Sequence, residues 1–247
     1  MPSSTARDVG VQSWSFREFK ALPELFTQLK AAGVSKTELC GVHCNFDDPA
    51  AHQPVVDACK AAGIQIVSIG VQTFTGDVKK EKQWFEFAKK AGAKHISAHF
   101  RVDSFREAVA STRALSEVYG IRVGVHCHGG YMFGGSVDII QHLIDLGQGA
   151  IGINIDTAWC MQAAGNPVEW VKKFAGRVYG IHYKDFLFDR AGKWSETVPG
   201  EGTLDLPALV KALDEVAFDG MAVIEYEADP KSPTAAITRG VQKIRAL

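Results

Sequence analysis

Residues 87–100 read FAKKAGAKHISAHF, and this stretch contains the pattern that decides the fold. It begins with two lysines in what reads as the last turn of a helix, reaches Gly92, and continues as a short apolar run that ends near His99. Glycine commonly closes helices, and cations near a helix C-terminus interact favourably with its dipole. The stretch therefore predicts a helix followed directly by a strand, with a polar side chain where the strand ends.

The same pattern recurs along the whole chain. FTQLKAAGV (26–34) and CKAAGI (59–64) end in the same way, and Pro23, Pro167 and Pro207 fall in or near first helical turns, where a missing N–H costs little. Eight strands are predicted, at 9–14, 34–40, 64–72, 94–100, 122–128, 150–156, 178–184 and 221–225. Eight helices are predicted after them, at 19–32, 50–62, 77–90, 104–119, 135–147, 166–175, 207–217 and 232–245.

Strict alternation of strand and helix predicts a parallel sheet with right-handed crossovers. Eight such units close a (β/α)8 barrel of about 250 residues, and the chain has 247. We therefore expect an α/β fold, a (β/α)8 TIM barrel, as a single domain over residues 1–247. A doubly wound open sheet is the alternative, but no Gly-rich phosphate turn follows the first predicted strand.

Composition and charge exclude several classes of protein. With 46% apolar and 22% charged residues, the chain resembles an ordinary soluble globular protein. Its formal net charge of −1, with scattered basic residues, predicts no nucleic-acid partner. The apolar runs are short and MPSSTARD (1–8) has no apolar segment, so we expect no membrane partner and a cytoplasmic location. An odd count of five cysteines without a CxxC pair predicts reduced thiols.

Polar residues collect at the predicted C-terminal ends of the strands, which is where active sites form in barrels. The stretch VHCHGG (125–130) places His126 and His128 at alternate positions of one strand, so both should face the barrel axis. Alternation points Cys127 away from the axis, which disfavours a Cys/His hydrolase. The other polar residues at or just past strand ends are Glu38, His43, His99, Asp156, His182, Lys184, Asp185 and Glu225.

Burial at the barrel mouth is electrostatically unfavourable for all of these side chains. An unpaired buried charge is costly, so acids and imidazoles gathered at a barrel mouth need a common partner. Carboxylate oxygens and neutral histidine nitrogens are suitable ligands for Mn, Co, Zn or Mg, and such a site leaves positions open for substrate oxygens. The sequence therefore predicts one divalent metal ion, of unspecified identity, at the mouth.

Four motifs carry a family resemblance. NIDTAW (154–159), GRVYGIHYKD (176–185), VPGEG (198–202) and VIEYE (223–227) together resemble the sugar phosphate isomerase/epimerase family with the xylose isomerase-like TIM barrel. In that family a Glu, an Asp, a His and a Glu at the ends of strands five to eight commonly hold one metal. The resemblance implies Asp156, His182 and Glu225 as ligands, with His126 at the position of the first Glu. His128 stands where the family has its next His, and Trp159 replaces another family His.

The resemblance implies a metal-dependent isomerase or epimerase that abstracts a proton next to the carbonyl of a sugar or related polyol. Glu225 is the expected general base, and Glu38, His126 or Lys184 could return the proton. The expected substrate contacts are His43, His99, His128, Trp159 and Glu201. His126 departs from the pair of metal-bound glutamates that exchange the proton in the family's epimerases.

Other functions stay open beside this one. Loss of a β-hydroxyl would make the chain a lyase that dehydrates a keto-sugar or inosose, and loss of the metal would make it a non-catalytic sugar-binding barrel. An endonuclease would need three metals and a cationic DNA track, which the near-neutral charge disfavours. No phosphate-binding Gly turn follows strands seven or eight, so a phosphorylated substrate is not assumed. The expected partner is a small carbohydrate, and a homo-oligomer is compatible with the sequence.

Overall fold

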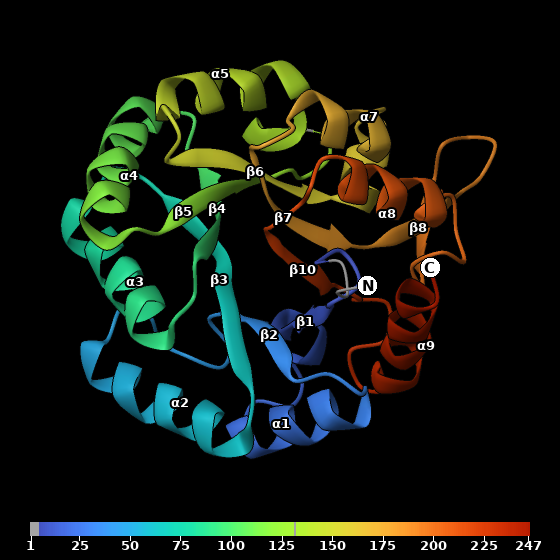
Figure 1. Cartoon of the computed structure of the whole chain (residues 1–247), viewed down its shortest axis with the longest axis horizontal. Helices are drawn as coiled ribbons and strands as arrows, with labels where there is room; N and C mark the ends of the chain where they lie inside the picture. The colour runs from blue at the N-terminus through green and yellow to red at the C-terminus, as the bar shows by residue number, and fades with distance from the viewer. Residues whose placement is uncertain (1–4, 131) are drawn as a thin grey trace.

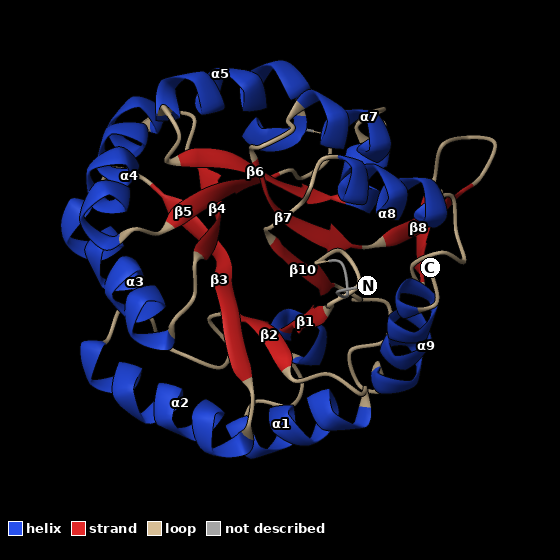
Figure 2. Cartoon of the chain, viewed as in Figure 1, coloured by secondary structure: helices blue, strands red, loops and turns tan. Residues whose placement is uncertain are grey.

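The computed structural model describes residues 5–130 and 132–247, and its centre is a closed barrel of eight parallel strands (Figure 2). Each strand pairs with its neighbours in the chain, and β10 closes the barrel against β1. The predicted TIM barrel is thus confirmed, although residues 1–4 and 131 of the predicted range lie outside the described residues. The barrel strands are β1 Gly10–Gln12, β2 Lys36–Leu39, β3 Gln65–Phe74, β4 His95–Phe100, β5 Arg122–His126, β6 Ile151–Asp156, β7 Val178–Tyr183 and β10 Met221–Ile224.

The α-helices form a ring around the barrel (Figure 1). Left-handed glycines at positions 63, 92 and 120 end three of them, and Asp48, Asp77 and Asp205 each accept a hydrogen bond from a backbone N–H in a first turn. The helix ends read from the sequence therefore have the expected physical basis. The helices are α1 Leu22–Ala31, α2 Pro49–Ala62, α3 Val78–Ala91, α4 Phe105–Tyr119, α5 Val137–Gly147, α6 Thr157–Gln162, α7 Pro167–Lys173, α8 Leu206–Glu215 and α9 Thr234–Arg245.

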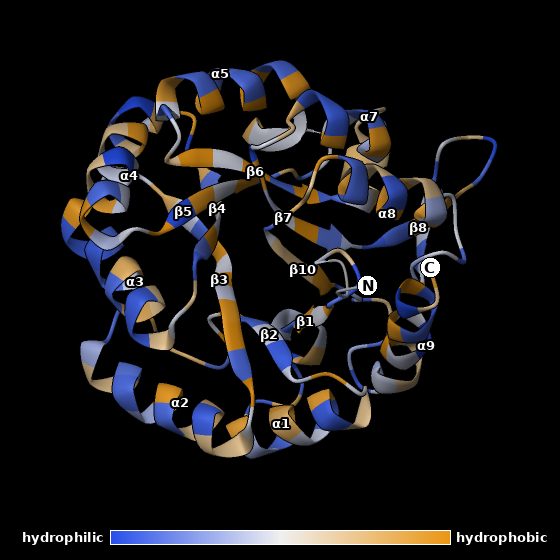
Figure 3. Ribbon diagram, viewed as in Figure 1, coloured by the Kyte–Doolittle hydropathy of each residue, from blue (hydrophilic) through white to orange (hydrophobic). Residues whose placement is uncertain are grey.

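The hydrophobic core lies between the barrel and the helix ring. The helices alternate hydrophobic and hydrophilic residues around their circumference, which is the amphipathic pattern of a helix with one face on a core (Figure 3). On β5, Val123 and Val125 are completely or almost completely buried and belong to this core. Their outward direction leaves the alternate positions of the same strand for the barrel interior.

Side chains on the inner face contact one another across the barrel. Asp156 of β6 is level with His182 of β7 in the parallel register. Asn154, two residues before Asp156, places its Nδ2 2.8 Å from Ser97 Oγ and 3.0 Å from His182 Nε2. Because these contacts join β4, β6 and β7 through the interior, they confirm the period-two assignment that directs Asp156 and His182 to the barrel axis.

Besides the short 3-10 helices η1 Ser13–Phe16, which takes the end of the strand predicted at 9–14, and η2 Phe133–Gly135, two elements near the mouth were not predicted. The segment after β7 forms an antiparallel hairpin of β8 Asp185–Phe188 and β9 Trp194–Thr197. Asp189 closes its turn by accepting hydrogen bonds from the N–H groups of Ala191 and Lys193, and Gly192 has a φ of +79°. The short helix α6 begins at the predicted end of strand six because the Asp156 carboxylate caps it. Both elements bring additional side chains to the mouth.

None of the described helices is both long enough and apolar enough to cross a membrane. The five cysteines, which all lie in the described part of the chain, are free thiols and are buried.

Candidate functional site

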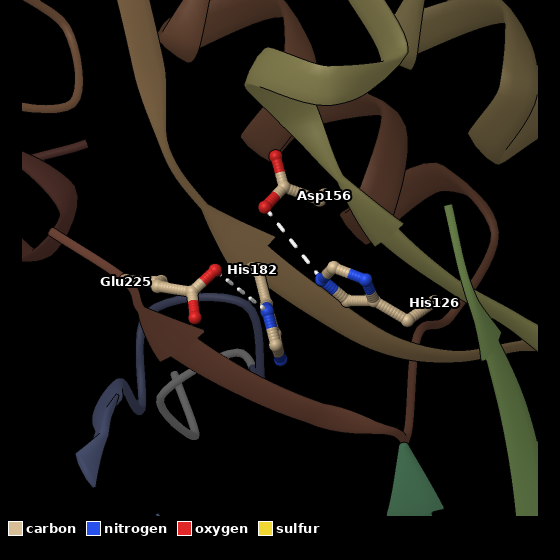
Figure 4. Close-up of side chains that lie close together, drawn as sticks. All are labelled: His126, Asp156, His182 and Glu225. Atoms are coloured by element: carbon tan, nitrogen blue, oxygen red, sulfur yellow. Dashed lines mark ion pairs between the residues drawn. The ribbon is translucent and has the colours of Figure 1, made fainter. Parts of the chain in front are cut away.

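Four side chains meet at the C-terminal mouth of the barrel (Figure 4). His126, Asp156 and His182 lie at or near the ends of β5, β6 and β7, and Glu225 directly follows β10. One donor atom from each lies within 4.8 Å of the donor atoms of the other three. The structure therefore brings together the four residues that the sequence analysis expects to bind a metal.

Three donor atoms of this cluster, from His126, Asp156 and His182, are buried but have no hydrogen-bond partner. Asp156 accepts the N–H of Trp159 through Oδ1 at 3.0 Å, which leaves Oδ2 without a partner. His126 contacts His99 through Nδ1, at 3.2 Å from its Nε2, and this leaves His126 Nε2 without a partner. His182 Nδ1 is a third such atom. Buried polar atoms are nearly always satisfied, so three of them facing one point indicate a missing partner.

Two of the separations among these atoms are close to those of metal ligands. His126 Nε2 lies 3.7 Å from Asp156 Oδ2, and His182 Nδ1 lies 3.5 Å from Glu225 Oε2. Donors around a cation with bonds of about 2.1 Å are separated by roughly 3 to 3.5 Å. Two imidazole nitrogens and two carboxylate oxygens form a donor set that first-row divalent metals accept. The cluster can therefore hold a metal ion.

His182 is oriented from below by Glu38. Its Nε2 lies 3.0 Å from Glu38 Oε1, so the opposite nitrogen, Nδ1, faces the cluster. Burial alone lowers the pKa of His182, but the neighbouring Glu38 and Glu225 carboxylates outweigh it and raise the pKa to about 10. A carboxylate that accepts from the distal nitrogen of a histidine fixes both its tautomer and its ring direction.

Glu38 lies beneath the cluster, away from the cavity described below. Its side chain is fully buried and accepts hydrogen bonds from Gln12 and, at 2.5 Å, from Ser97 Oγ. Burial raises the pKa of this carboxyl. The contacts with His182 and with serine hydroxyls lower it by more than burial raises it, so the pKa lies below its usual value. This position favours a supporting role for Glu38 over the expected role of returning a proton to the substrate.

Lys184 lies beside the cluster and pairs with three carboxylates. Its Nζ is 3.4 Å from Glu225 Oε2 and 3.6 Å from Glu196 Oε1, and it also pairs with Glu227. Burial lowers the pKa of Lys184, but Glu225 and the other surrounding carboxylates raise it above its usual value. An ammonium with a raised pKa is a weak acid, so this environment favours an electrostatic role over the expected proton transfer.

The carboxylates of the cluster differ in their protonation. Burial raises the pKa of Glu225, but Lys184 and His182 outweigh it and hold this pKa well below its usual value. Burial raises the pKa of Asp156 to about 7. Glu225 is thus ionised at neutral pH, as a general base must be.

A cavity of about 400 Å³ opens beside the cluster. This volume falls in the range of roughly 300 to 1,000 Å³ that is typical of small-molecule sites. The lining residues in the described part of the chain are Gln12, Trp14, Cys40, Gly41, Val42, Gly70, Val71, His99, His126, His128, Trp159, Glu225 and Glu227. The cluster therefore has room beside it for a small molecule.

Three of the expected substrate contacts, His99, His128 and Trp159, line this cavity. The rings of His128 and Trp159 are stacked, with centroids 4.2 Å apart at an angle of 23°. His128 Nδ1 is buried and makes no hydrogen bond within the described structure. These positions are compatible with the expected substrate contacts.

His43 has a different environment. Both of its ring nitrogens have partners inside the protein, Ser13 Oγ at 3.1 Å from Nδ1 and the Phe19 carbonyl at 3.1 Å from Nε2. The side chain is buried and ties the segment after β2 to the segment after β1. Its contacts favour a structural role over the expected substrate contact.

Glu201 is also not among the residues that line the cavity. Its carboxylate lies 3.5 Å from Arg239 Nε and 3.7 Å from Lys243 Nζ, both on α9. The loop that carries it is fixed by Asp185, whose carboxylate accepts three backbone N–H groups of residues 200–204 at 2.9 to 3.0 Å. Glu201 therefore stabilises the loop against α9, and Asp185 anchors the loop instead of pairing with Lys184.

Two further residues line the cavity: Trp14, which the sequence offers only as an aromatic residue that could stack on a sugar ring, and Glu227, which was not expected at the site. Trp14 follows β1, and its Nε1 donates a hydrogen bond of 2.6 Å to Glu227 Oε1. The available signal was the spacing in VIEYE, because Glu227 follows Glu225 by two positions. Glu196, which reaches Lys184 from the hairpin, had no comparable signal because the hairpin itself was not predicted.

A family model described as xylose isomerase-like TIM barrel matches residues 26–247 of the chain. The chain is also similar to the inosose dehydratase of Clostridium beijerinckii, with 27% identity over 132 residues, or 47% of this chain. That match covers only 44% of the relative's length. The inosose dehydratase of Klebsiella pneumoniae is 24% identical over a longer alignment that covers 84% of this chain and 83% of the relative.

Solved structures show the same fold. The xylose isomerase domain protein of Planctomyces limnophilus superimposes with a TM-score of 0.72 at 23% identity, covering 89% of this chain and 90% of that one. The 3-keto-D-glucoside 4-epimerase of E. coli gives a TM-score of 0.76 at 18% identity, with 97% and 99% coverage.

Proposed function

The chain belongs to the xylose isomerase-like TIM barrel family, and we propose that it is a metal-dependent enzyme that removes a proton beside the carbonyl of a small carbohydrate. The observation that carries this proposal is the cluster of His126, Asp156, His182 and Glu225. Its unpartnered donor atoms face one another, and two of its members, His126 and Glu225, also line the cavity. A metal site beside a small-molecule cavity is the usual arrangement of a metal-assisted catalyst.

We propose Mn, Co, Zn or Mg as the cation, because two imidazole nitrogens and two carboxylate oxygens suit these ions. When bound, the cation would stabilise the negative charge that develops on the carbonyl oxygen of the substrate. The four residues named above would hold it. His99 and Glu38 would keep the two imidazoles in their ligating orientations through contacts of 3.2 Å and 3.0 Å.

Glu225 is the proposed general base. Its contacts with Lys184 and His182 run through Oε2, so Oε1 is the atom left to accept a proton from a substrate carbon. Lys184 keeps the carboxylate ionised, which prevents it from being protonated before substrate arrives.

We propose that the reaction continues as a dehydration. The C–H bond breaks toward Glu225, a double bond forms to the neighbouring carbon, and the hydroxyl on that carbon leaves as water after gaining a proton. Two observations support this outcome. The curated relatives named above are inosose dehydratases, and by the family resemblance His126 stands at the position of one of the two glutamates that a two-glutamate epimerase uses.

Isomerisation or epimerisation is the second candidate. It is favoured by His128, which lines the cavity and has a buried Nδ1 without a partner in the described structure. A neutral imidazole at that position could return the proton to a substrate carbon. The two candidates share the first step and differ in the fate of the proton.

The experiment that tests the proposed function follows the shared first step. An inosose, several ketoses and several aldoses are incubated in heavy water with the purified protein and Mn²⁺ or Co²⁺, and deuterium at the carbon beside the carbonyl is measured by NMR. We expect metal-dependent exchange. With the inosose, we also expect the ultraviolet absorbance of the conjugated enone that dehydration forms. Metal binding without exchange on any of these compounds would favour the non-catalytic sugar-binding barrel.

Replacing Glu38 with glutamine is expected to weaken metal binding by about 10- to 100-fold. Glutamine has the same size, but it lacks the charge that holds the proton on His182 Nε2 and keeps Nδ1 free. Calorimetric titration with Mn²⁺ or Co²⁺ gives the affinity directly. A catalytic role alone would instead lower kcat while leaving the affinity unchanged.

Glu81→Gln is the matched control for this variant. Glu81 of α3 is also fully buried, and it accepts hydrogen bonds from Ser111 of α4 and from the N–H groups of Thr75 and Gly76, which lie between β3 and α3. Its loss should lower the melting temperature without changing metal affinity. Equal losses of affinity in both variants would show that Glu38 acts only through overall stability.

A cytoplasmic location and a small carbohydrate partner complete the proposal. The near-neutral charge and the free thiols are compatible with both. The absence of a nucleic-acid partner and the compatibility with a homo-oligomer stay predictions from the sequence.

A further inference from the structure

Apart from the metal proposed above, the charged side chains of the cavity wall are of one sign. Among the described residues that line it, two are glutamates, three are histidines and none is lysine or arginine. Sites that bind phosphate or carboxylate groups usually offer a guanidinium, an ammonium or a free helix N-terminus. The helix that starts at the cluster, α6, already has its first turn capped by Asp156.

Two cations that contact residues of the cavity wall, Lys184 and Arg17, are bound to groups of the protein. Lys184 is 1% exposed, and its ammonium lies among the carboxylates of Glu225, Glu196 and Glu227. Arg17 donates hydrogen bonds to the backbone carbonyls of Trp14 at 3.1 Å and of Glu227 at 3.0 Å. Both cations are thus bound to groups of the protein, and the Arg17 guanidinium lies over the Trp14 ring, 5.1 Å from its centroid.

Glu227 is a carboxylate held in a fixed position on the cavity wall. Oε1 accepts the hydrogen bond from Trp14 Nε1, and Oε2 pairs with Lys184. Its backbone N–H donates to the Glu196 carboxylate at 3.0 Å. Its side chain is nonetheless 32% exposed, so lone pairs of the carboxylate stay accessible from the cavity.

Trp14 gives this carboxylate an apolar neighbour. The indole lines the cavity and is 39% exposed, an unusual degree of exposure for so large a ring. An indole face packs well against the C–H face of a saturated ring, while a carboxylate accepts hydrogen bonds from hydroxyl groups on its edge. The two groups together match the amphipathic surface of a cyclic polyol.

We propose that Glu227 and Trp14 form a hydroxyl-binding subsite that makes the cavity select uncharged polyols and reject phosphorylated or carboxylated ones. The inference deepens the proposed function and rests on it for the placement of the reacting carbon. Glu227 acts in two ways, since it accepts hydrogen bonds from neutral substrates and repels anionic ones at short range. Neither residue belongs to the metal cluster, so the subsite determines specificity and not the chemical step.

The test measures binding alone. myo-Inositol and myo-inositol 1-phosphate are titrated by calorimetry into the Mn²⁺-loaded protein, and neither probe has a carbonyl group to react. We expect the wild type to bind myo-inositol at least about tenfold more tightly than the phosphate. In Glu227→Gln, myo-inositol should bind about tenfold more weakly and the preference should shrink to within about threefold.

Two further variants secure the result. Trp14→Phe keeps an aromatic ring but removes the donor that fixes Glu227. It should therefore weaken the binding of myo-inositol without strengthening the binding of myo-inositol 1-phosphate. Glu215→Gln, on the outer helix α8, should bind both probes like the wild type. Equal or tighter binding of the phosphate by the wild type, unchanged affinities in Glu227→Gln, or no binding of either probe at millimolar concentration would each overturn the inference.

The outcome is separable from the proposed function. Deuterium exchange without discrimination between the probes would contradict the proposed subsite and support the proposed enzymatic function. Discrimination that depends on Glu227, without exchange on any substrate, would contradict the proposed enzymatic function and support a binding site for neutral polyols.

Discussion

The Glu225→Gln variant is expected to lose about 10³-fold in kcat for deuterium exchange or dehydration. Glutamine keeps the volume and one oxygen donor, but it cannot accept the substrate proton. KM should change much less than kcat, because glutamine has the same size as glutamate and the subsite at Glu227 is unaltered. The measurement is steady-state kinetics at saturating Mn²⁺ or Co²⁺ with the substrate that gives exchange in the wild type.

The metal content of the same variant is the necessary control. If the Glu225→Gln protein retains one cation per chain at the concentrations used, the lost rate belongs to proton transfer. Exchange within about tenfold of the wild-type rate, with metal bound, would show that another residue is the base. His128 would then be the first candidate, because its imidazole lines the cavity.

Asp156→Asn is expected to weaken metal binding by on the order of 100-fold or more and to abolish activity at ordinary metal concentrations. The introduced amide can still cap α6 through its oxygen, as Asp156 does with the Trp159 N–H at 3.0 Å. The ligand position, however, would carry an uncharged amide instead of carboxylate Oδ2. Metal affinity is measured by calorimetry, and activity is measured across a metal titration.

Asp205→Asn provides the matched control. Asp205 caps α8 by accepting the Ala208 N–H at 3.0 Å, and it has the same local role as Asp156 without a place in the cluster. Its variant should bind metal like the wild type. Similar affinities in Asp156→Asn and the wild type would exclude Asp156 as a ligand.

Much of the fold could be predicted because its signals are local. The Lys-Ala-Gly helix ends and the alternating strands depend on residues close together in the chain, and the eight barrel strands appear where these signals placed them. The cluster was predictable for the same reason. Strands that run parallel end at the same rim, so Asp156 and His182 had to become neighbours once the barrel closed.

The depth of each strand-end residue was not predictable in this way. Glu38 and Glu225 both lie near the end of a strand, but Glu38 is fully buried under His182 and Glu225 lines the cavity. The register between β2 and β3 shifts at Thr37 and Glu38, and such an irregularity leaves no trace in the residue pattern. The partners of Lys184 were hidden similarly, because Glu196 and Glu227 reach it from a hairpin and a loop.

The account depends on a single cation held by side chains from four different strand ends. The most direct measurement is a crystal structure of the protein grown with Mn²⁺, with anomalous diffraction used to locate the metal. We expect one anomalous peak within bonding distance of His126 Nε2, Asp156 Oδ2, His182 Nδ1 and a Glu225 carboxylate oxygen. An absent peak at saturating Mn²⁺, or a peak bound by other residues while these four diverge, would contradict the account.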